Sequence, residues 1–592
     1  MKKLLTILLA VLMCFTLIAC KKDSGEDPNN QSSTFDLENM NDIQTDVQKE
    51  FDALQKRWFK EDLESDYLNT HFSVEDPSAY GLKDLEVTLG EVESDEDDTT
   101  YSDRLAALAK YNVADLTPDQ QIMYKCMLFY FQLMVDAEGI EEDYTFCFTP
   151  NSGLNNNLIT NFTEFDIRNE QDARDLITLV QDSGRYIDEC IQYTKDQAEK
   201  GIAQTDSVID SIIEQCERFI SKVDDNEVIT VYNSRIDDMN LADGEQLKKE
   251  MATAVKNVLI PGYKRIISMY KGLYGKNTTN GRLAEYGEDG KKTYELIFRN
   301  KVSTSKSVGE MISEMQDVFD DVIKEIIGIR IGALTDDYGY TELEDILGHL
   351  QEEMVKDFPA PETLEYKVNY LDPSVVSDNV SAYYLLAPID NIHNNVIKVN
   401  PTFVEQDING LCITLAHEGF PGHLYQHTYY FGNHPNNEYR YGMTFLGYAE
   451  GWAMYVESNA YNYFLTSSKE VRYMQLNDMF SYYLYGLIDM QMHYNNWSKN
   501  KISRFLSNYL AEEYAEEYAE AIYDTNIGDP GMFLPYSVGM YQMITLYETA
   551  KEALGEEFDM IEYNKVILDT GEAPFDVVKE RVDAYIAFKQ GK

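Results

Sequence analysis

The sequence predicts a mainly α-helical protein with one small β-sheet beside a candidate metal-binding helix. Over most of the chain, apolar residues recur at three- and four-residue spacing, which is the period of a helix that buries one face. Two short runs rich in Val, Ile, Leu and Tyr, at 380–387 and 395–400, are typical of β-strands joined by a turn. A stretch dense in His and Glu follows at 415–427. We therefore expect the strands to lie next to this stretch.

The helical pattern starts after residue 40 and has recognisable boundaries. Thr117 before Pro118 is the pattern of an N-cap residue followed by proline at the first helical position. The segment 275–292 is rich in Gly, Asn and Lys and is predicted to be an exposed loop. We expect the apolar stripes to pack the core and assign none of them a ligand. The predicted helices are 46–63, 101–111, 118–135, 171–201, 206–223, 247–273, 307–327 and 341–350.

The first residues have the pattern of a lipoprotein signal peptide. Lys2 and Lys3 give a basic start, an apolar run fills 4–18, and the run closes as Leu-Ile-Ala before Cys20. Because this run is too short to cross a membrane comfortably as a helix, residues 1–19 are predicted to be removed on export. Cys20 then becomes the acylated first residue, which anchors the chain in the cell membrane at its extracytoplasmic face.

The rest of the chain is predicted to form one tethered domain. Residues 20–40 are polar, with Gly, Pro, Asn and Ser, and are typical of a flexible tether. From 41 to 592 we find neither a linker nor a repeat of fixed period, which favours a single helical domain. Since this length exceeds one ordinary core, we expect two lobes, approximately residues 41–360 and 361–592.

Acidic residues dominate the charge of the chain. It has 50 Lys and Arg against 103 Asp and Glu, which gives a net charge of −53. Binding to nucleic acid depends on clustered cationic side chains, so we expect no nucleic acid partner. The acidic residues are spread along the sequence and are expected to lie on solvated faces.

The cysteines are expected to be buried thiols. Cys14 leaves with the signal peptide and Cys20 is the lipidated residue. The five others form no C-x-x-C pair, and most lie in apolar helical settings, where a thiol behaves as a small apolar group. They are Cys126, Cys147, Cys190, Cys216 and Cys412.

The stretch 415–427 reads L-A-H-E-G-F-P-G-H-L-Y-Q-H and carries three of the eight histidines. A His followed directly by Glu, with more His nearby, is how zinc hydrolases place a metal ligand beside a general base. The usual H-E-x-x-H spacing is not met, because the residue four after His417 is Pro421. On a straight helix His417 and His423 would be about 9 Å apart along the axis and turned by about 240°. That is too far for one zinc ion with bonds of about 2.0–2.1 Å.

A break in the helix after His417 would remove this difficulty. Pro421 cannot continue the helix, because its ring clashes with the carbonyl of the residue four earlier, and Gly422 allows almost any backbone turn. A Pro-Gly kink would bring His423 back toward His417. The regular alternative pairs His423 with His427 at i, i+4 and leaves His417 outside the ligand set. The spacing alone leaves both arrangements open.

This stretch resembles the signature of a known family. The segment 417–426 fits H-E-x-x-P-G-H-x-x-Q, which is similar to the signature of the bacterial domain-of-unknown-function family 885, often lipoproteins and related to the zincin metallopeptidases. Three later motifs agree in order and spacing. The segment 449–457 resembles E-G-W-A-x-Y-x-E, 489–493 resembles D-x-x-x-H, and 530–539 resembles P-G-x-x-L-x-Y-x-x-G. The resemblance covers the chain roughly from residue 45 to its end.

The resemblance implies a helical zincin-like fold with a deep cleft between its lobes and one Zn²⁺ per chain. His417 and His423 are the expected nitrogen ligands. Glu450, on a second helix that crosses the first, is the expected carboxylate ligand, and one position stays open for water. Glu457, two turns after Glu450 on the same face, and Asp489 are expected to orient the ligands from behind.

The expected reaction follows from these roles. Glu418 takes a proton from the water that attacks a carbonyl and gives it to the leaving amine. Tyr536 and His493, from their places in the matched motifs, are the candidate donors to the oxyanion. A strand near the metal helix commonly pairs with an extended peptide in zincins. The predicted protein is therefore a membrane-tethered zinc peptidase that acts on short peptides.

The chain departs from the family pattern at three places where a basic residue is usual. Thr525 and Ser537 stand where the family has Arg before the Pro-Gly and Lys after the Tyr, and Tyr485 stands in place of another Arg. These losses affect recognition of the substrate end more than the metal site. Two alternatives remain open: a non-catalytic lipoprotein that binds peptide or another solute, and a hydrolase of a non-peptide amide such as a cell-wall crosslink.

Overall fold

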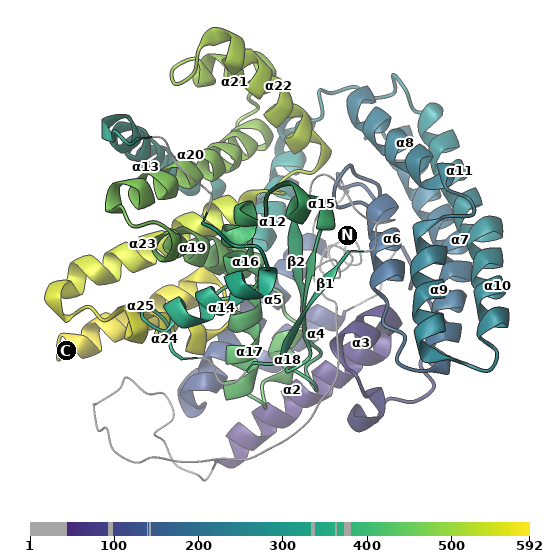
Figure 1. Cartoon of the computed structure of the whole chain (residues 1–592), viewed down its shortest axis with the longest axis horizontal. Helices are drawn as coiled ribbons and strands as arrows, with labels where there is room; N and C mark the ends of the chain where they lie inside the picture. Colours follow the sequence, from purple (N-terminus) through teal and green to yellow (C-terminus); the bar gives the residue numbers. More distant parts are fainter. Residues whose placement is uncertain are drawn as a thin grey trace.

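The computed structural model describes residues 44–92, 99–138, 140, 144–332, 338–360, 364–371 and 380–592. The predicted signal peptide and tether, with Cys20, lie outside these residues. Within them the prediction of a mainly helical protein with one small sheet is confirmed (Figure 1). None of the helices in these ranges combines the length and the apolarity that crossing a membrane requires.

Six helices form a bundle that stands at one side of Figure 1. Their apolar stripes face inward; α7, for example, buries Leu176, Leu179 and Ile187. The predicted helix 247–273 is interrupted by one π-helical turn at Val255–Leu259. The bundle consists of α6 (Leu154–Glu164), α7 (Glu170–Glu199), α8 (Asp206–Ser221), α9 (Glu227–Met239), α10 (Gly244–Ala254) and α11 (Ile260–Lys271).

The remaining helices lie outside this bundle (Figure 1). The N-terminal ones are α2 (Asp46–Ser65), α3 (Tyr67–Ser73), α4 (Thr100–Leu108) and α5 (Pro118–Glu138). The middle ones are α12 (Gly287–Val302), α13 (Val308–Gly328), α14 (Leu343–Met354), α15 (Pro401–Asp407), α16 (Leu411–Glu418), α17 (His423–Asn433) and α18 (Glu438–Tyr441). The C-terminal ones are α19 (Leu446–Phe464), α20 (Ser468–His493), α21 (Lys499–Leu506), α22 (Glu512–Gly528), α23 (Leu534–Leu554), α24 (Met560–Thr570) and α25 (Phe575–Lys589).

Two large apolar cores hold these elements together, and they do not divide the chain at residue 360. One core joins α6–α11 to α13 and α20, through residues such as Met315 and Ile488. The other joins the N-terminal helices to α16 and α19, where Trp58, Leu415 and Trp452 belong to one cluster. Each core contains residues from both sides of residue 360, the approximate boundary of the predicted lobes 41–360 and 361–592, so the chain passes between the cores more than once.

The sheet has three strands in the order β1-β3-β2. The strands β2 (Ala382–Leu385) and β3 (Asn395–Val399) pair antiparallel, which confirms the predicted hairpin. The strand β1 (Tyr366–Tyr370), which sequence reasoning missed, pairs parallel to β3 on its other side. As a result β2 is an edge strand, and it contacts α16 and α17.

The helix predictions are confirmed within a few residues, and one loop prediction is partly wrong. Thr117 caps α5 as expected, since its hydroxyl accepts the backbone N–H of Gln120 at 3.2 Å. The predicted loop 275–292 becomes helical at Leu283–Tyr286 and continues as α12. Gly290 is needed there because a Cβ would lie 2.0 Å from the carbonyl oxygen of Leu283. The glycine that suggested a loop thus permits close packing of a helix.

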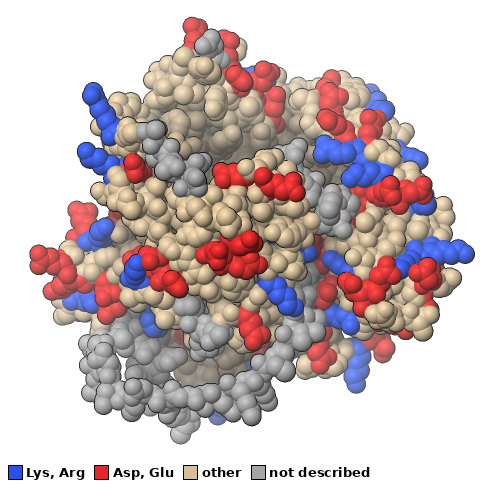
Figure 2. All heavy atoms as spheres, in the orientation of Figure 1, with Lys and Arg blue, Asp and Glu red and all other residues tan. Residues whose placement is uncertain are grey.

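Charge is distributed over the surface in small groups. On the face seen in Figure 2, Asp and Glu side chains lie in several separate clusters, and Lys and Arg side chains are mostly interspersed with them. No continuous cationic patch is visible on this face of the described residues.

Candidate metal centre

The helix breaks after His417, as the sequence suggested. The helix α16 ends at Glu418, and α17 starts at His423. At Gly422 a Cβ would lie 1.7 Å from the carbonyl oxygen of His417, so the backbone can approach this closely only because the residue is glycine. The indole Nε1–H of Trp452 donates to the carbonyl of Pro421 at 3.0 Å and ties the kink to α19. The Pro-Gly break is thus a packed feature of the fold.

The kink brings three candidate ligands together. His417, His423 and Glu450 each place one ligand atom so that all three atoms lie within 4.8 Å of one another. Glu450 Oε2 lies 3.5 Å from His417 Nε2 and 3.3 Å from His423 Nε2. Ligands bound tetrahedrally at about 2.0–2.1 Å are separated by about 3.3 Å, so these distances suit one small cation.

Glu450 also has an unused acceptor. Its side chain is buried, and Oε2 accepts no hydrogen bond from any described residue. A buried carboxylate oxygen without a partner is costly, and a cation between it and the two imidazoles would remove that cost. The donor set of two imidazoles and one carboxylate is that of many catalytic zinc sites.

Glu457 orients the first histidine. Its Oε2 lies 3.0 Å from His417 Nδ1, on the side of the ring opposite to the Nε2 that faces Glu450. An Nδ1–H that donates to a carboxylate fixes the tautomer and leaves Nε2 free as a ligand. Glu457 therefore lies behind His417, on the side of the ring that faces away from Glu450.

Replacing Glu457 by Gln should weaken metal binding by about 10–100-fold without removing the site. An amide removes the charge that supports His417 and leaves the ring free to adopt the other tautomer. Competition with a chromogenic chelator would measure the affinity, with Glu245→Gln as a matched control, because the side chain of Glu245 is 92% exposed on α10. Equal affinities for the two variants would contradict the role of Glu457.

Glu418 lies between the candidate ligands and the edge strand. The backbone N–H of Tyr384 in β2 donates to Glu418 Oε2 at 2.8 Å. Burial raises the pKa of Glu418 above its usual value, although the charges of His417 and His423 oppose this. A carboxyl group whose pKa is raised toward neutrality is suited to accept and return a proton.

Tyr536 lies on the opposite side of the site, on α23. Its ring stacks with His417 at 6.4 Å between centroids. The charge of Glu450 raises the pKa of Tyr536 well above its usual value, so the phenol keeps its proton. The helices α19 and α23 can approach closely because Gly451 has no Cβ. A Cβ at this position would lie 2.7 Å from the backbone of Gly539.

The candidate ligands strongly influence one another's protonation. Burial alone would disfavour the charged form of His417, but Glu450 and Glu457 hold its pKa well above the usual value. Burial likewise opposes ionisation of Glu450, and the neighbouring imidazoles outweigh it and lower the pKa of this carboxyl.

Two predicted residues do not belong to this cluster. His493 is fully buried, and both ring nitrogens contact backbone: Nδ1 accepts the N–H of Leu283 at 3.2 Å, and Nε2 lies 3.0 Å from the carbonyl of Asn526. It has no free N–H for an oxyanion, so its proposed catalytic role is wrong. Asp489 accepts hydrogen bonds from the Tyr294 hydroxyl and the Gly531 N–H and from no histidine among the described residues, which corrects its expected role too.

The alternative ligand pair with His427 is also excluded. His427 Nε2 lies 3.1 Å from the carbonyl of Ala387, and the side chain is buried among aromatic rings. Burial lowers its pKa to about 4. It is thus a packed core histidine on the face of α17 next to the end of β2.

Sequence reasoning missed one cation near the site. Lys301, in the last turn of α12, is half-buried, and burial lowers its pKa to about 8 while the charges of Asp529 and Glu450 favour its charged form. Ser537, which stands where the family has Lys, has a buried hydroxyl without a hydrogen bond among the described residues. The signal for Lys301 was weak, because it lies far from every motif in the sequence.

Comparison with known proteins gives the family and the fold. The family model described as "Bacterial protein of unknown function (DUF885)" matches residues 79–582. No curated protein matches the chain in sequence. A candidate lipoprotein from Colwellia psychrerythraea has a similar structure, with a TM-score of 0.73 and 16% identity over 92% of this chain and 100% of its own. A candidate lipoprotein of unknown function from Shewanella oneidensis gives a TM-score of 0.56 and 14% identity over 89% of this chain and 99% of its own.

Proposed function

For this chain, which belongs to the DUF885 family of bacterial proteins of unknown function, we propose the function of a zinc-dependent hydrolase of peptide bonds. The observation that carries the proposal is the group of His417, His423 and Glu450 with Glu418 directly beside it. Histidines alone would fit a structural metal. Glu418 is a buried carboxylate outside the candidate ligand set, and it lies next to that set and to the edge strand β2. Its position favours a catalytic metal over a structural one.

Zinc in such a site supplies a Lewis acid and lowers the pKa of a water molecule. Glu418 accepts the proton of the water that attacks the carbonyl and then passes it to the leaving nitrogen. Tyr536, which keeps its proton, donates to the oxyanion that develops on the carbonyl oxygen. Glu457 holds His417 in the tautomer that the site requires.

The edge strand β2 supports a peptide as the substrate. The N–H of Asn400 donates to the carbonyl of Ser381, so the backbone groups of Ser381 point toward β3. Because this direction alternates along a strand, the backbone N–H and C=O groups of Ala382 and Tyr384 point away from β3. The outward N–H of Tyr384 is already bound by Glu418. An extended peptide added along this edge would run directly to the general base, which favours short, unfolded peptides.

Anchoring at the membrane is part of the proposal and rests on the N-terminal sequence. The pattern around Cys20 fits acylation, and the proteins from Colwellia psychrerythraea and Shewanella oneidensis are described as candidate lipoproteins. Lipid attachment at Cys20 would place the site outside the cytoplasm. A Cys20→Ala protein should then move from the membrane fraction to the soluble fraction, and its retention in the membrane would rule out this anchor.

The second candidate function is a lipoprotein that binds peptide or another solute without cutting it. The absence of basic residues at Thr525, Ser537 and Tyr485 favours altered recognition. Hydrolysis of a cell-wall amide would use the same zinc chemistry as peptide hydrolysis. An assay that offers both kinds of substrate distinguishes the two hydrolase activities.

The deciding experiment is digestion of a peptide library by protein that starts after Cys20, read by mass spectrometry. We expect cleavage of short peptides that a chelator stops and zinc restores. A parallel incubation with cell-wall muropeptides tests the amide alternative. Binding of peptides without any cleavage, in zinc-loaded protein, would replace the hydrolase by the binding function.

A further inference from the structure

A small cavity lies beside the candidate metal centre, between α17, the end of β2 and the turn after α24. Its volume is about 40 Å³, which is room for a few water molecules or for one short polar group. Most of its wall is apolar, but three polar side chains reach it from α17, α18 and the turn after α24. The residues that line it include Leu386, Gln426, Tyr430, Phe431, Arg440 and Glu572.

The cavity follows the candidate metal centre along two elements. On α17, Gln426 comes three residues after His423, so the two side chains share a helix face and lie about 4.5 Å apart along the axis. At the end of β2, Leu386 comes two residues, or about 6.6 Å, after Tyr384, whose N–H is bound by Glu418. A peptide that runs along this edge past Glu418 would therefore bring its next group to the cavity.

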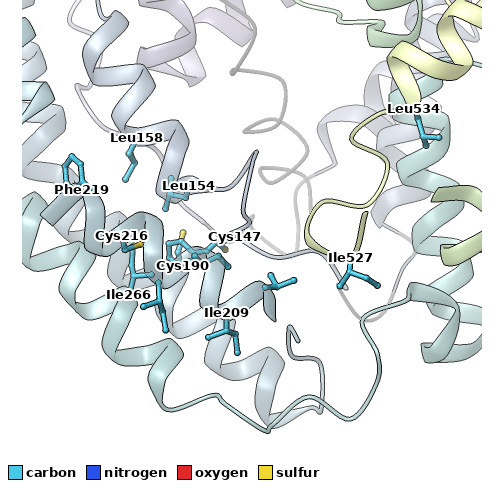
Figure 3. Packing of buried hydrophobic residues seen from close by; sticks show 14 of the residues in the cluster. Cys147, Leu154, Leu158, Cys190, Ile209, Cys216, Phe219, Ile266, Ile527 and Leu534 are labelled. Atoms are coloured by element: carbon cyan, nitrogen blue, oxygen red, sulfur yellow. The ribbon is translucent and has the colours of Figure 1, made fainter. Parts of the chain in front are cut away.

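Gln426, the last residue of the 417–426 motif, has an amide without a partner. The side chain is 5% exposed, and its Nε2 is buried without a hydrogen bond to any described residue. The bundle core in Figure 3 is different, because side chains such as Leu158, Phe219 and Ile266 are apolar and need no hydrogen bond. A buried amide without a partner is costly unless water or a ligand accepts its hydrogen bond.

Arg440 brings a positive charge to the same cavity. The side chain is 3% exposed; its Nε donates to the carbonyl of Glu572 at 2.5 Å, and its Nη2 donates to the carbonyl of Thr570 at 2.9 Å. These acceptors are neutral, and the Glu572 carboxylate instead accepts the N–H of Phe445 at 3.4 Å. The guanidinium is thus fixed by backbone groups and forms no ion pair with a carboxylate of the described residues. A bound carboxylate would stabilise such a buried cation.

We propose that this cavity binds a carboxylate of the peptide substrate, with the Gln426 amide and the Arg440 guanidinium as the donors. The choice of a peptide as the ligand rests on the proposed function. The carboxylate is either the C-terminal group of a short peptide or the side chain of an acidic residue next to the cleaved bond. Each offers two acceptor oxygens, one for each donor. The rings of Tyr430 and Phe431 keep water away and thereby strengthen these contacts.

The test measures peptide binding by calorimetry to zinc-loaded Glu418→Gln protein that starts after Cys20, in which cleavage is not expected. One pair of probes is acetylated tetra-alanine with a free C-terminal carboxylate and the same peptide with a C-terminal amide. The second set is amidated throughout and carries Glu or Gln at each position in turn. We expect the carboxylate to bind about 10–100-fold more tightly than its amide in one of the two arms, which identifies its source.

Gln426→Leu removes the amide at nearly constant side-chain volume and should reduce this preference by about 5–10-fold. The matched control is Gln192→Leu, because Gln192 is exposed on α7 and should leave the preference unchanged. The wild-type preference should also persist in zinc-free protein, since the metal is not one of the donors.

Equal binding of carboxylate and amide in both arms, or a preference that Gln426→Leu leaves intact, would overturn the assignment. A preference that disappears without zinc would overturn it too, because the carboxylate would then bind the metal. The outcome is distinguishable from that of the proposed function. Cleavage by the wild type without any preference for a carboxylate keeps the hydrolase and removes this site, whereas carboxylate-dependent binding without cleavage does the reverse.

Discussion

Glu418→Gln should reduce peptide hydrolysis by about 10²–10⁴-fold while the protein keeps its metal. The amide oxygen of Gln can still accept the N–H of Tyr384, so the contact between α16 and β2 is preserved. What is lost is the ability to take a proton from water and return it to the leaving nitrogen. The measurement is kcat/KM on a cleaved peptide, together with zinc per chain.

The matched control for this variant is again Glu245→Gln, which removes one exposed carboxylate from α10 and should leave the rate unchanged. Loss of zinc together with activity in Glu418→Gln would mean that Glu418 supports the ligands instead of acting on protons. A fully active, zinc-loaded Glu418→Gln protein would show that another group is the base.

Tyr536→Phe should lower kcat by about 10²–10³-fold with little change in KM. The ring and its stacking on His417 remain, and only the hydroxyl is removed. A donor that acts on the developing oxyanion contributes in the transition state more than in the bound substrate. Steady-state kinetics over a range of peptide concentrations separates the two parameters.

Tyr514→Phe on α22 is the control, because Tyr514 is 53% exposed and distant in sequence from the motifs. If Tyr536→Phe raises KM and leaves kcat unchanged, the hydroxyl binds substrate and does not stabilise the transition state. If Tyr536→Phe alters zinc affinity instead, the main role of the hydroxyl is its interaction with Glu450.

The proximity of His417 and His423 could be predicted from sequence because it follows from local chemistry. Proline and glycine between His417 and His423 imply a break, and the break is what brings the two imidazoles together. Glu450 and Glu457 lie two turns apart on one face of one helix. Glu450 can therefore join the two histidines as a candidate ligand, while Glu457 contacts His417 from behind. Most helices could also be predicted from the spacing of apolar residues, because each helix buries one apolar stripe.

The errors concern contacts between segments distant in sequence. His493 has the right residue type in a matched motif, but the fold turns it toward Leu283 and Asn526, which no spacing reveals. The two cores mix N- and C-terminal helices, and the sequence does not show which distant helices share a core. The strand β1 is short and mostly exposed, and it lacks the apolar run that identified the other two strands.

The most direct test of the account is the zinc content per chain of protein that starts after Cys20, for the wild type beside His417→Ala and His423→Ala. We predict about one zinc in the wild type and its loss in both variants, with circular dichroism that shows each still folded. Well-folded wild-type protein that holds no zinc after loading, or variants that retain a full equivalent, would contradict the kinked ligand pair on which the proposed chemistry depends.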